Sequence, residues 1–264
     1  MKTKERLDKL LPELGLAETR TKAQALIMAG KVRVNGQVIT KSGAMYERGV
    51  SITVDDVQKW AGRGALKLLR AFEVFGIEVN GKICADIGAS TGGFTDVMLA
   101  HGARKVYAVD VGYGQLLWRL ATDSRVVVMD RTNARYLTRS DFPERVEFAG
   151  CDVSFISLRL ILPMLDDVVS GEAVVLIKPQ FEAGRERISR GVVRDKAIHA
   201  DVVEGILSFI RDKTAFKVRG LTYSPIRGPE GNIEFLCRVS HSGDDENFAV
   251  NDIVDEAHEY TRGD

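Results

Sequence analysis

Two lysines and two carboxylates stand at the ends of predicted strands and helices in this sequence. Lys178 closes the apolar run "AVVLI", Asp152 follows "FAGC", Glu234 precedes "FLC", and Lys67 lies in "GRGALKL". A lysine with an ordinary pKa of about 10.4 is protonated at neutral pH and cannot remove a proton. Burial and a second ammonium nearby lower that pKa, whereas neighbouring carboxylates raise it. The sequence therefore indicates a site for proton transfer. It leaves open whether the lysine pKa values are lowered by burial and the second ammonium or raised by the carboxylates.

These four side chains form one site only if the elements that carry them meet at the same edge of a sheet. Asp152 and Lys178 each follow a predicted parallel strand. Glu234 begins a strand that we expect to be antiparallel, so its start lies at the edge where the parallel strands end. Lys67, at the start of a helix that precedes the sheet, can fold over that edge. The predicted catalytic residues are Lys67, Asp152, Lys178 and Glu234.

The glycine-rich segment "DIGASTGGFTD" lies between the first predicted strand and the next helix, where open α/β sheets bind nucleotide-like ligands. Its glycines allow a tight turn and a close approach of the backbone to a ligand. The spacing is neither G-x-G-x-x-G nor a Walker loop, and the loop has no basic residue for a pyrophosphate. Asp86, two residues before Gly88, suits a ligand with an ammonium group, such as the methionine part of S-adenosylmethionine.

Two further aspartates follow the next two strands. Asp110 ends the second strand, where a carboxylate can accept both hydroxyls of a ribose. Asp130 ends the third and is placed to reach an adenine amino group. Three strand-end aspartates around one glycine loop favour an adenosine-containing cofactor, and an NAD enzyme is the alternative from this region alone. The candidate cofactor-binding residues are Asp86, Gly88, Ser90, Gly92, Gly93, Phe94, Asp110, Asp130 and Asn133.

The order of the apolar runs predicts an α/β fold. "KICADIG", "KVYAVD", "RVVVMD", "RVEFAGCDVSF" and "EAVVLIK" are separated by helical stretches, which is typical of a parallel sheet covered on both faces. "FKVRGLTYSP" and "NIEFLCRVS" follow with no room for a helix between them, so they should pair antiparallel. This pattern predicts the seven-stranded sheet of class I (Rossmann-like) methyltransferases.

The first 60 residues form a small basic module. They hold 11 Lys and Arg against 7 Asp and Glu, which leaves 26 against 30 in the rest of the chain. Leucines at helical spacing in "RLDKLLPELGL" predict one helix, and Thr19 and Gly30 bound a second. Asn35-Gly36 in "VRVNGQVI" predicts a type I′ hairpin. The charge suggests a polyanionic partner, although a solvated charged face is the alternative.

This module resembles the small RNA-binding domain first described in ribosomal protein S-four, over residues 4–54. The resemblance implies that basic side chains of the module face RNA phosphates. We therefore expect an α+β RNA-binding domain at 1–58 and an FtsJ-like methyltransferase domain at 59–264. The expected RNA-binding residues are Arg6, Arg20, Lys22, Lys31 and Arg33.

The whole chain resembles the hemolysin-A-like (TlyA) family of ribosomal RNA methyltransferases, which are relatives of the FtsJ-type 2′-O-methyltransferases. The motifs that carry the resemblance are "GRGALKL", "DIGASTGGFTD", "AVDVGYGQLLWRL", "DRTNAR", "CDVSFISL", "LIKPQFE", "RGVVRD" and "SPIRGPEGNIEFL". The resemblance implies a Lys-Asp-Lys-Glu tetrad on the four residues named above and S-adenosylmethionine in the glycine loop. It also implies a cytidine ribose in ribosomal RNA as the substrate, within RNA or assembled subunits.

Other methyl acceptors fit the sequence less well. Methylation of a base amino group goes with an N-P-P-[YF] turn after the fourth strand, and "CDVSF" is not one. Methylation at cytosine carbon 5 needs a cysteine nucleophile in a Pro-Cys turn, and Cys151 lacks it. The three cysteines show no CxxC spacing, so we expect no disulfide framework and no metal site.

Composition predicts a soluble cytoplasmic protein. The longest apolar run is five residues, far short of the 18 to 20 of a membrane span, and the first residues lack the apolar stretch of a secretion signal. Two alternatives to the enzyme are an RNA-binding protein with an inactive methyltransferase body and a pore-forming hemolysin. The sequence disfavours the second and leaves the oligomeric state open.

Overall fold

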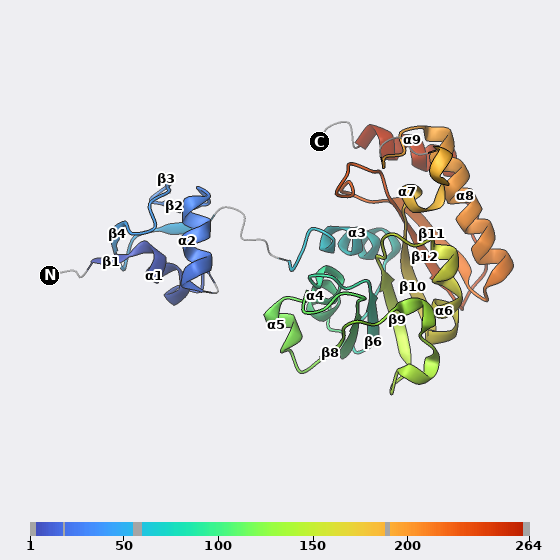
Figure 1. Ribbon diagram of the computed structural model, residues 1–264, viewed down its shortest axis with the longest axis horizontal. Coiled ribbons are helices and arrows are strands. Elements are labelled where there is room, and N and C mark those ends of the chain that lie inside the picture. Colours follow the sequence, from blue (N-terminus) through green and yellow to red (C-terminus); the bar gives the residue numbers. More distant parts are fainter. Residues whose placement is uncertain (1–3, 18, 55–59, 188–190, 261–264) are drawn as a thin grey trace. The chain divides into compact units, whose positions relative to one another are not determined.

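The computed structural model describes residues 4–17, 19–54, 60–187 and 191–260. The chain divides into two compact units, Met1–Lys59 and Trp60–Asp264 (Figure 1). The predicted domain boundary between residues 58 and 59 lies outside the described residues. No described helix combines the length and the apolar character needed to cross a membrane.

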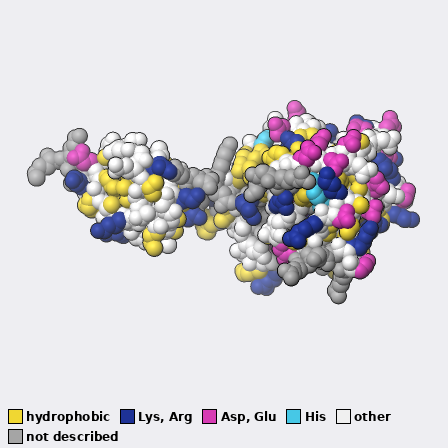
Figure 2. All heavy atoms as spheres, turned by 90° about the horizontal axis from the view of Figure 1, so that it is seen from above, with side chains coloured by type: hydrophobic (Ala, Val, Ile, Leu, Met, Phe, Trp, Pro, Cys, Tyr) yellow, Lys and Arg dark blue, Asp and Glu magenta, His cyan; other side chains and the backbone are white. Residues whose placement is uncertain are grey.

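The first unit is a small α+β module, as the sequence predicts. Its elements are β1 (Lys4–Arg6), α1 (Leu7–Glu13), α2 (Arg20–Met28), β2 (Val32–Val34), β3 (Gln37–Ile39), β4 (Met45–Glu47) and β5 (Ile52–Val54). Thr19 caps α2 by accepting a hydrogen bond from the backbone N–H of Lys22, which confirms the predicted helix start. Asn35 and Gly36 have φ of 51° and 82°, and they turn β2 into β3. Lys and Arg side chains are spread over the visible face of this smaller unit (Figure 2).

The second unit alternates strands and helices. It begins with α3 (Ala65–Phe75), β6 (Ile83–Ile87), α4 (Gly93–Ala100), β7 (Lys105–Val109), α5 (Trp118–Ala121), β8 (Val126–Met129) and β9 (Val146–Cys151). It continues with α6 (Leu162–Val168), β10 (Val169–Ile177), α7 (Pro179–Glu182), α8 (Lys196–Lys213), β11 (Lys217–Tyr223), β12 (Phe235–Ser240) and α9 (Val250–Tyr260). Short 3-10 turns lie at Ala134–Tyr136, Arg139–Asp141, Leu158–Leu160 and Arg185–Arg187.

Seven strands of the described residues form one sheet in the order β11-β12-β10-β9-β6-β7-β8. The strands from β6 to β10 are parallel, and β12 runs antiparallel between β10 and β11. This confirms the predicted mixed sheet with its antiparallel pair. Ile177 pairs with Phe235. Lys178, which follows β10, and Glu234, which precedes β12, therefore lie at the same edge of the sheet.

Apolar side chains cover both faces of the sheet. Along β10, Val174 and Leu176 join the cluster under α3 and α4, whereas Val175 and Ile177 join the cluster under α6 and α8. Figure 1 shows these two pairs of helices on opposite sides of the sheet. Side chains alternate across a strand, so a strand buried on both faces must be apolar throughout. This explains the uninterrupted run "AVVLI".

Candidate active site

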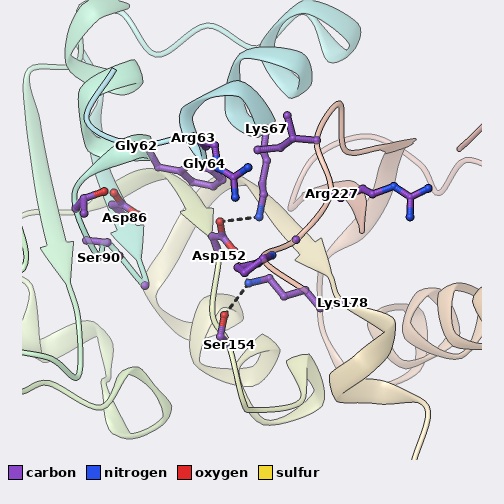
Figure 3. A pocket seen from close by; sticks show the side chains of 18 residues that line it. Gly62, Arg63, Gly64, Lys67, Asp86, Ser90, Asp152, Ser154, Lys178 and Arg227 are labelled. Atoms are coloured by element: carbon purple, nitrogen blue, oxygen red, sulfur yellow. Dashed lines mark hydrogen bonds and ion pairs between the residues drawn. The ribbon is translucent and has the colours of Figure 1, made fainter. Parts of the chain in front are cut away.

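The four predicted catalytic residues meet at the carboxyl edge of the parallel strands. Lys67 Nζ lies 2.7 Å from Glu234 Oε2 and 3.2 Å from Asp152 Oδ2. Lys178 Nζ lies 2.5 Å from the other oxygen of Asp152, Oδ1. Figure 3 shows Lys67 and Lys178 pointing toward Asp152. We call these four residues the charge cluster. Asp152 contacts the amines of both lysines, and Glu234 contacts that of Lys67.

Each member of the charge cluster is positioned by the end of an element. Asp152 follows β9, Lys178 follows β10, and Glu234 precedes β12. Lys67 lies in the first turn of α3, and an added Cβ at Gly64 would come within 3.6 Å of Asp152 Oδ2. Helix α3 therefore approaches the strand ends closely enough for its lysine to reach them.

Burial and the neighbouring carboxylates act on the pKa of Lys67 in opposite directions. Burial favours the neutral amine, but the carboxylates of Asp152 and Glu234 together outweigh it and raise the pKa of Lys67. Burial likewise favours the neutral form of Asp152, and the ammonium groups of Lys67 and Lys178 together lower its pKa. Lys67 is therefore held as an ammonium between Asp152 and Glu234, which disfavours it as the proton acceptor.

Two cavities open beside the charge cluster. The first has a volume of about 290 Å³, and Lys67, Lys178 and Asp86 line it. The second has a volume of about 510 Å³ and is lined by Asp110 and Asn133, among others. The residues common to both walls are Gly88, Ser90, Asp152 and Ser154. The two cavities therefore adjoin along the strand ends, with Asp152 between them.

Sequence reasoning missed Ser154. Its hydroxyl accepts a hydrogen bond from Lys178 Nζ at 2.9 Å (Figure 3). It lies two residues after Asp152 in "CDVSF", just beyond the end of β9, and lines the same two cavities as Asp152. That spacing is the signal that could have found it. Arg63 and Arg227, also missed, line the first cavity and bring positive charge to it.

The glycine loop is shaped by close backbone contacts. Gly88 has φ of +89°, and a Cβ there would lie 2.7 Å from the backbone oxygen of Asp152. A Cβ at Gly93 would lie 2.9 Å from the backbone nitrogen of Ala65, so α4 can approach α3 only with glycine at this position. Gly92 has φ of +97° and faces Leu120 instead of the cavities. The loop glycines therefore serve the turn and the packing as well as the cavity wall.

Asp86 is a buried carboxylate with an open hydrogen-bonding position. It is 1% exposed, and its Oδ2 accepts hydrogen bonds from the N–H and the hydroxyl of Thr95, both at 2.7 Å. Its Oδ1 has no hydrogen-bond partner among the described residues, and the residue lines the first cavity. Burial raises the pKa of Asp86 to about 7. The ammonium group of S-adenosylmethionine fits this position, because it would satisfy the free oxygen and favour the ionised form.

Asp110 lies in the wall of the second cavity. Its Oδ1 accepts from the N–H of Gly112 and its Oδ2 from the N–H of Ser90, each at 2.7 Å. A carboxylate offers about four lone-pair positions, so both oxygens retain room for a ribose hydroxyl. Asp130 does not belong to the residues that line either cavity. It accepts the N–H of Gly114 at 2.8 Å and so fixes the loop that follows β7.

The remaining cofactor-binding candidates also lie at the cavities. Ser90 belongs to both walls and has the left-handed φ of 47°, which is costly for a residue other than glycine. Phe94 lines the first cavity and Asn133 the second. Within the described part of the chain, no group of three or more His, Cys, Asp or Glu side chains is arranged to hold a metal ion.

In the first unit, two predicted RNA-binding arginines converge on a buried carboxylate. Arg6 donates hydrogen bonds to Asp8 from Nε at 3.0 Å and from Nη2 at 2.8 Å. Arg20 donates to Asp8 from Nε and from Nη2, each at 3.2 Å. Gln24 adds a hydrogen bond at 2.7 Å. The Arg6 and Arg20 side chains remain 41% and 51% exposed. Lys22 on α2 is exposed, whereas Lys31 and Arg33 are partly buried near and on β2.

Comparisons with known proteins agree with this geometry. Residues 60–240 match the FtsJ-like methyltransferase family, and residues 5–52 match the S4 domain. The protein YqxC of Bacillus subtilis is 48% identical over 97% of this chain and 94% of its own. The 16S/23S rRNA (cytidine-2′-O)-methyltransferase TlyA of Mycobacterium tuberculosis is 44% identical, with 89% and 90% of the two chains covered.

A solved structure supports the same fold. A protein from Streptococcus thermophilus that carries a hemolysin name superposes with a TM-score of 0.76 at 44% identity, covering 100% of this chain and 98% of its own. The family match spans more than half of the chain, and the buried Asp86 Oδ1 has no hydrogen-bond partner among the described residues. The chain therefore belongs to the FtsJ-like methyltransferase family, carries an S4 domain, and is an enzyme that uses S-adenosylmethionine as its methyl donor.

Proposed function

We propose that this enzyme methylates the 2′-hydroxyl of a ribose in ribosomal RNA, with cytidine as the modified nucleoside. The observation that carries the proposal is the charge cluster beside two adjoining cavities, one of which is lined by Asp86, whose Oδ1 has no hydrogen-bond partner among the described residues. A ribose hydroxyl is a weak nucleophile, so it needs a group that removes its proton. The named activity of the tuberculosis relative supports the RNA and the nucleoside.

The proposed reaction breaks a carbon–sulfur bond and an oxygen–hydrogen bond, and it forms an oxygen–carbon bond and a bond from the proton to its acceptor. Bound S-adenosylmethionine supplies a methyl group on a positively charged sulfonium. The ribose oxygen bonds to the methyl carbon, the carbon–sulfur bond breaks with its electrons on sulfur, and the hydroxyl proton leaves. Asp86 holds the ammonium of the donor and Asp110 its ribose, so the chain fixes the donor at both ends. Alignment of this kind contributes a large part of the rate in such reactions.

Lys178 is the proposed proton acceptor. Its Nζ lies in the first cavity and contacts Asp152 and Ser154. In its neutral form the amine can take the hydroxyl proton, and the resulting ammonium is then held by the Asp152 carboxylate and the Ser154 hydroxyl. Lys67, which remains charged, keeps Asp152 in place from the other side.

The rim of the second cavity offers a surface for a nucleic-acid base. Phe155 is 89% exposed, lines that cavity, and has φ of 64°, which is strained for an aromatic residue. Its ring centroid lies 5.1 Å from that of Phe181. Exposed aromatic rings stack on unpaired bases. This supports RNA as the substrate rather than a small molecule.

The S4 domain is the proposed grip on structured RNA, through Arg6, Arg20, Lys22, Lys31 and Arg33. We propose that the RNA-binding domain comprises residues 1–58 and the methyltransferase domain residues 59–264. The activity places the enzyme with ribosomal subunits, which implies the cytoplasm. The hemolysin alternative is not favoured, because the named activity of the tuberculosis relative is RNA methylation.

The decisive experiment follows a labelled methyl group. Ribosomal subunits from a strain without this enzyme are incubated with purified protein and methyl-labelled S-adenosylmethionine, and the RNA is then hydrolysed in alkali. A 2′-O-methyl group blocks cleavage of the adjacent phosphodiester, so label should remain in alkali-resistant dinucleotides with cytidine at the methylated position. Label released in mononucleotides would show base methylation instead. No incorporation, with cofactor binding intact, would favour the RNA-binding alternative.

A further inference from the structure

Gln180 lies behind the charge cluster, in the short helix α7 that follows Lys178. Its side-chain Nε2 donates a hydrogen bond to Glu234 Oε1 at 3.2 Å. The other oxygen of Glu234, Oε2, accepts from Lys67 Nζ at 2.7 Å. The two oxygens of Glu234 are therefore held by donors from two different elements, α7 and α3.

Glu234 is enclosed, so its orientation depends on these donors. It is 1% exposed, and a Cβ at Gly228 would lie 2.7 Å from Oε1. The loop that contains Gly228 therefore closes over the oxygen that Gln180 binds. A buried carboxylate oxygen without a donor is costly. Loss of the amide would leave Oε1 without this donor and favour rotation of Glu234, which would release Lys67.

The orientation of the Gln180 amide has its own cost. Its Oε1 is buried and has no hydrogen-bond partner in the described part of the structure. The opposite orientation of the amide would place this carbonyl oxygen against the Glu234 carboxylate, which is repulsive. The amide thus leaves its acceptor unsatisfied in order to donate to Glu234. Unsatisfied buried polar atoms are rare in folded proteins, and they concentrate where function requires them.

We propose that Gln180 is a positioning residue that fixes Glu234, and through it the Lys67 ammonium, in the arrangement that holds Asp152 and Lys178 at the cavity. The inference rests on the proposed function of this site. A neutral donor suits this position because the Lys67 ammonium already lies between the carboxylates of Glu234 and Asp152. A cation at position 180 would compete with Lys67 for Glu234, and an anion would repel Glu234.

The test compares Q180M and Q180E with the wild-type enzyme. Methionine has nearly the same length as glutamine but donates no hydrogen bond. We expect Q180M to lower kcat by roughly 10- to 100-fold, because a small displacement of reacting groups has an effect of that order. The dissociation constant for S-adenosylmethionine should stay unchanged, because Asp86 and Asp110 are untouched.

Q180E provides the signature that a purely structural role would not produce. A protonated glutamic acid can donate an O–H to Glu234 as the amide donates its N–H, whereas the ionised form cannot. The activity of Q180E relative to Q180M should therefore rise as the pH falls. Melting temperatures of both variants show whether they remain folded under assay conditions.

Two results would overturn the inference, and neither is confused with failure of the proposed function. A Q180M enzyme with wild-type kcat and pH profile would show that Glu234 needs no donor from Gln180. An equal loss of activity at every pH in Q180M and Q180E, together with weaker binding of S-adenosylmethionine, would assign Gln180 to the fold. Failure of the proposed function appears in the wild-type enzyme itself, as label outside the ribose, and the kcat comparison still applies to whichever methyl acceptor is then found.

Discussion

Two buried aspartates, one in each unit, have pKa values shifted in opposite directions. Asp8 in the first unit is 0% exposed and Asp86 in the second is 1% exposed. Asp8 receives hydrogen bonds from Arg6, Arg20 and Gln24, and the Arg6 guanidinium above all holds the pKa of that carboxyl well below its usual range against the effect of burial. Asp86 accepts hydrogen bonds from Thr95 and has no cationic partner among the described residues, and burial raises its pKa to about 7.

The difference in partners shows that the hydrogen bonds of Asp8 are satisfied within the protein, whereas Asp86 still lacks a partner for one oxygen among the described residues. Arginine is always charged and binds carboxylates with a rigid fork, so the Asp8 group is complete within the protein. Asp86 keeps an unpartnered oxygen at a cavity, so it is complete only when a cation arrives. The charge cluster stands between these cases, because Asp152 is paired with lysines, and a lysine can exchange its proton.

Replacement of Lys178 by alanine separates chemistry from binding and should have the largest effect. We expect a loss of turnover of about 10²- to 10⁴-fold, the usual contribution of a general base. Binding of S-adenosylmethionine should be unchanged, because Asp86 is untouched. Single-turnover rates with ribosomal subunits and calorimetric binding measure the two quantities. K196A, which removes an exposed ion pair with Asp255, is the control. Wild-type rates in K178A would remove Lys178 from the mechanism.

The D86N variant tests whether Asp86 awaits the ammonium of the cofactor. Loss of one charge from a buried pair costs about 3 kcal/mol, so affinity for S-adenosylmethionine should fall roughly 100-fold. Calorimetry with the full chain measures it, and D8N serves as the control that removes a buried charge elsewhere. Equal affinities in D86N and the wild-type enzyme would contradict the assignment of the free oxygen to the cofactor.

The pH dependence of cofactor binding tests whether the raised pKa of Asp86 controls the affinity for S-adenosylmethionine. Asp86 is neutral below its pKa of about 7, and the ammonium group binds the ionised form better. Affinity for S-adenosylmethionine should therefore fall by about tenfold per pH unit below that value. Because this pKa is raised on folding, stability of the free enzyme should decrease as pH rises from about 4 to about 7. Thermal shifts induced by the cofactor should grow over that range. D86N should show a flat profile, and a pH dependence retained in D86N would point to another group.

The D8N variant asks whether the arginines of the first unit act by charge or by orientation, and it has the smallest expected effect. If charge alone matters, removal of a negative group should strengthen RNA binding. If Asp8 orients Arg6 and Arg20, binding should weaken by roughly threefold to tenfold. We expect weakening, measured with ribosomal RNA fragments at fixed salt. E13Q removes an equal charge from the exposed pair with Arg48 and should not weaken binding. Tighter binding by D8N would favour the charge account.

Much of the fold follows from local patterns. The apolar runs, the Thr19 cap and the Asn35-Gly36 turn predict their elements because periodicity and turn chemistry act over a few residues. The strand-end positions of Asp152 and Lys178 follow from the same reasoning. Asp130 shows the limit: its place at a strand end suggests an adenine contact, which stays a prediction, and the structure adds that its carboxylate accepts the N–H of Gly114. Partner choice depends on loop geometry, which local patterns do not specify.

The sequence by itself determined the two kinds of unit, the order of the strands along the chain and the residue types at their ends. Only the tertiary structure decided which oxygen of Glu234 Lys67 contacts across 167 residues of sequence, that Ser154 and Gln180 bind members of the charge cluster, and that Asp86 Oδ1 has no partner among the described residues. It also decided that Lys67 stays charged. The physical reason is that pKa and hydrogen bonding depend on distances between groups from α3, β9, β10 and β12, and these distances exist only once the sheet has formed.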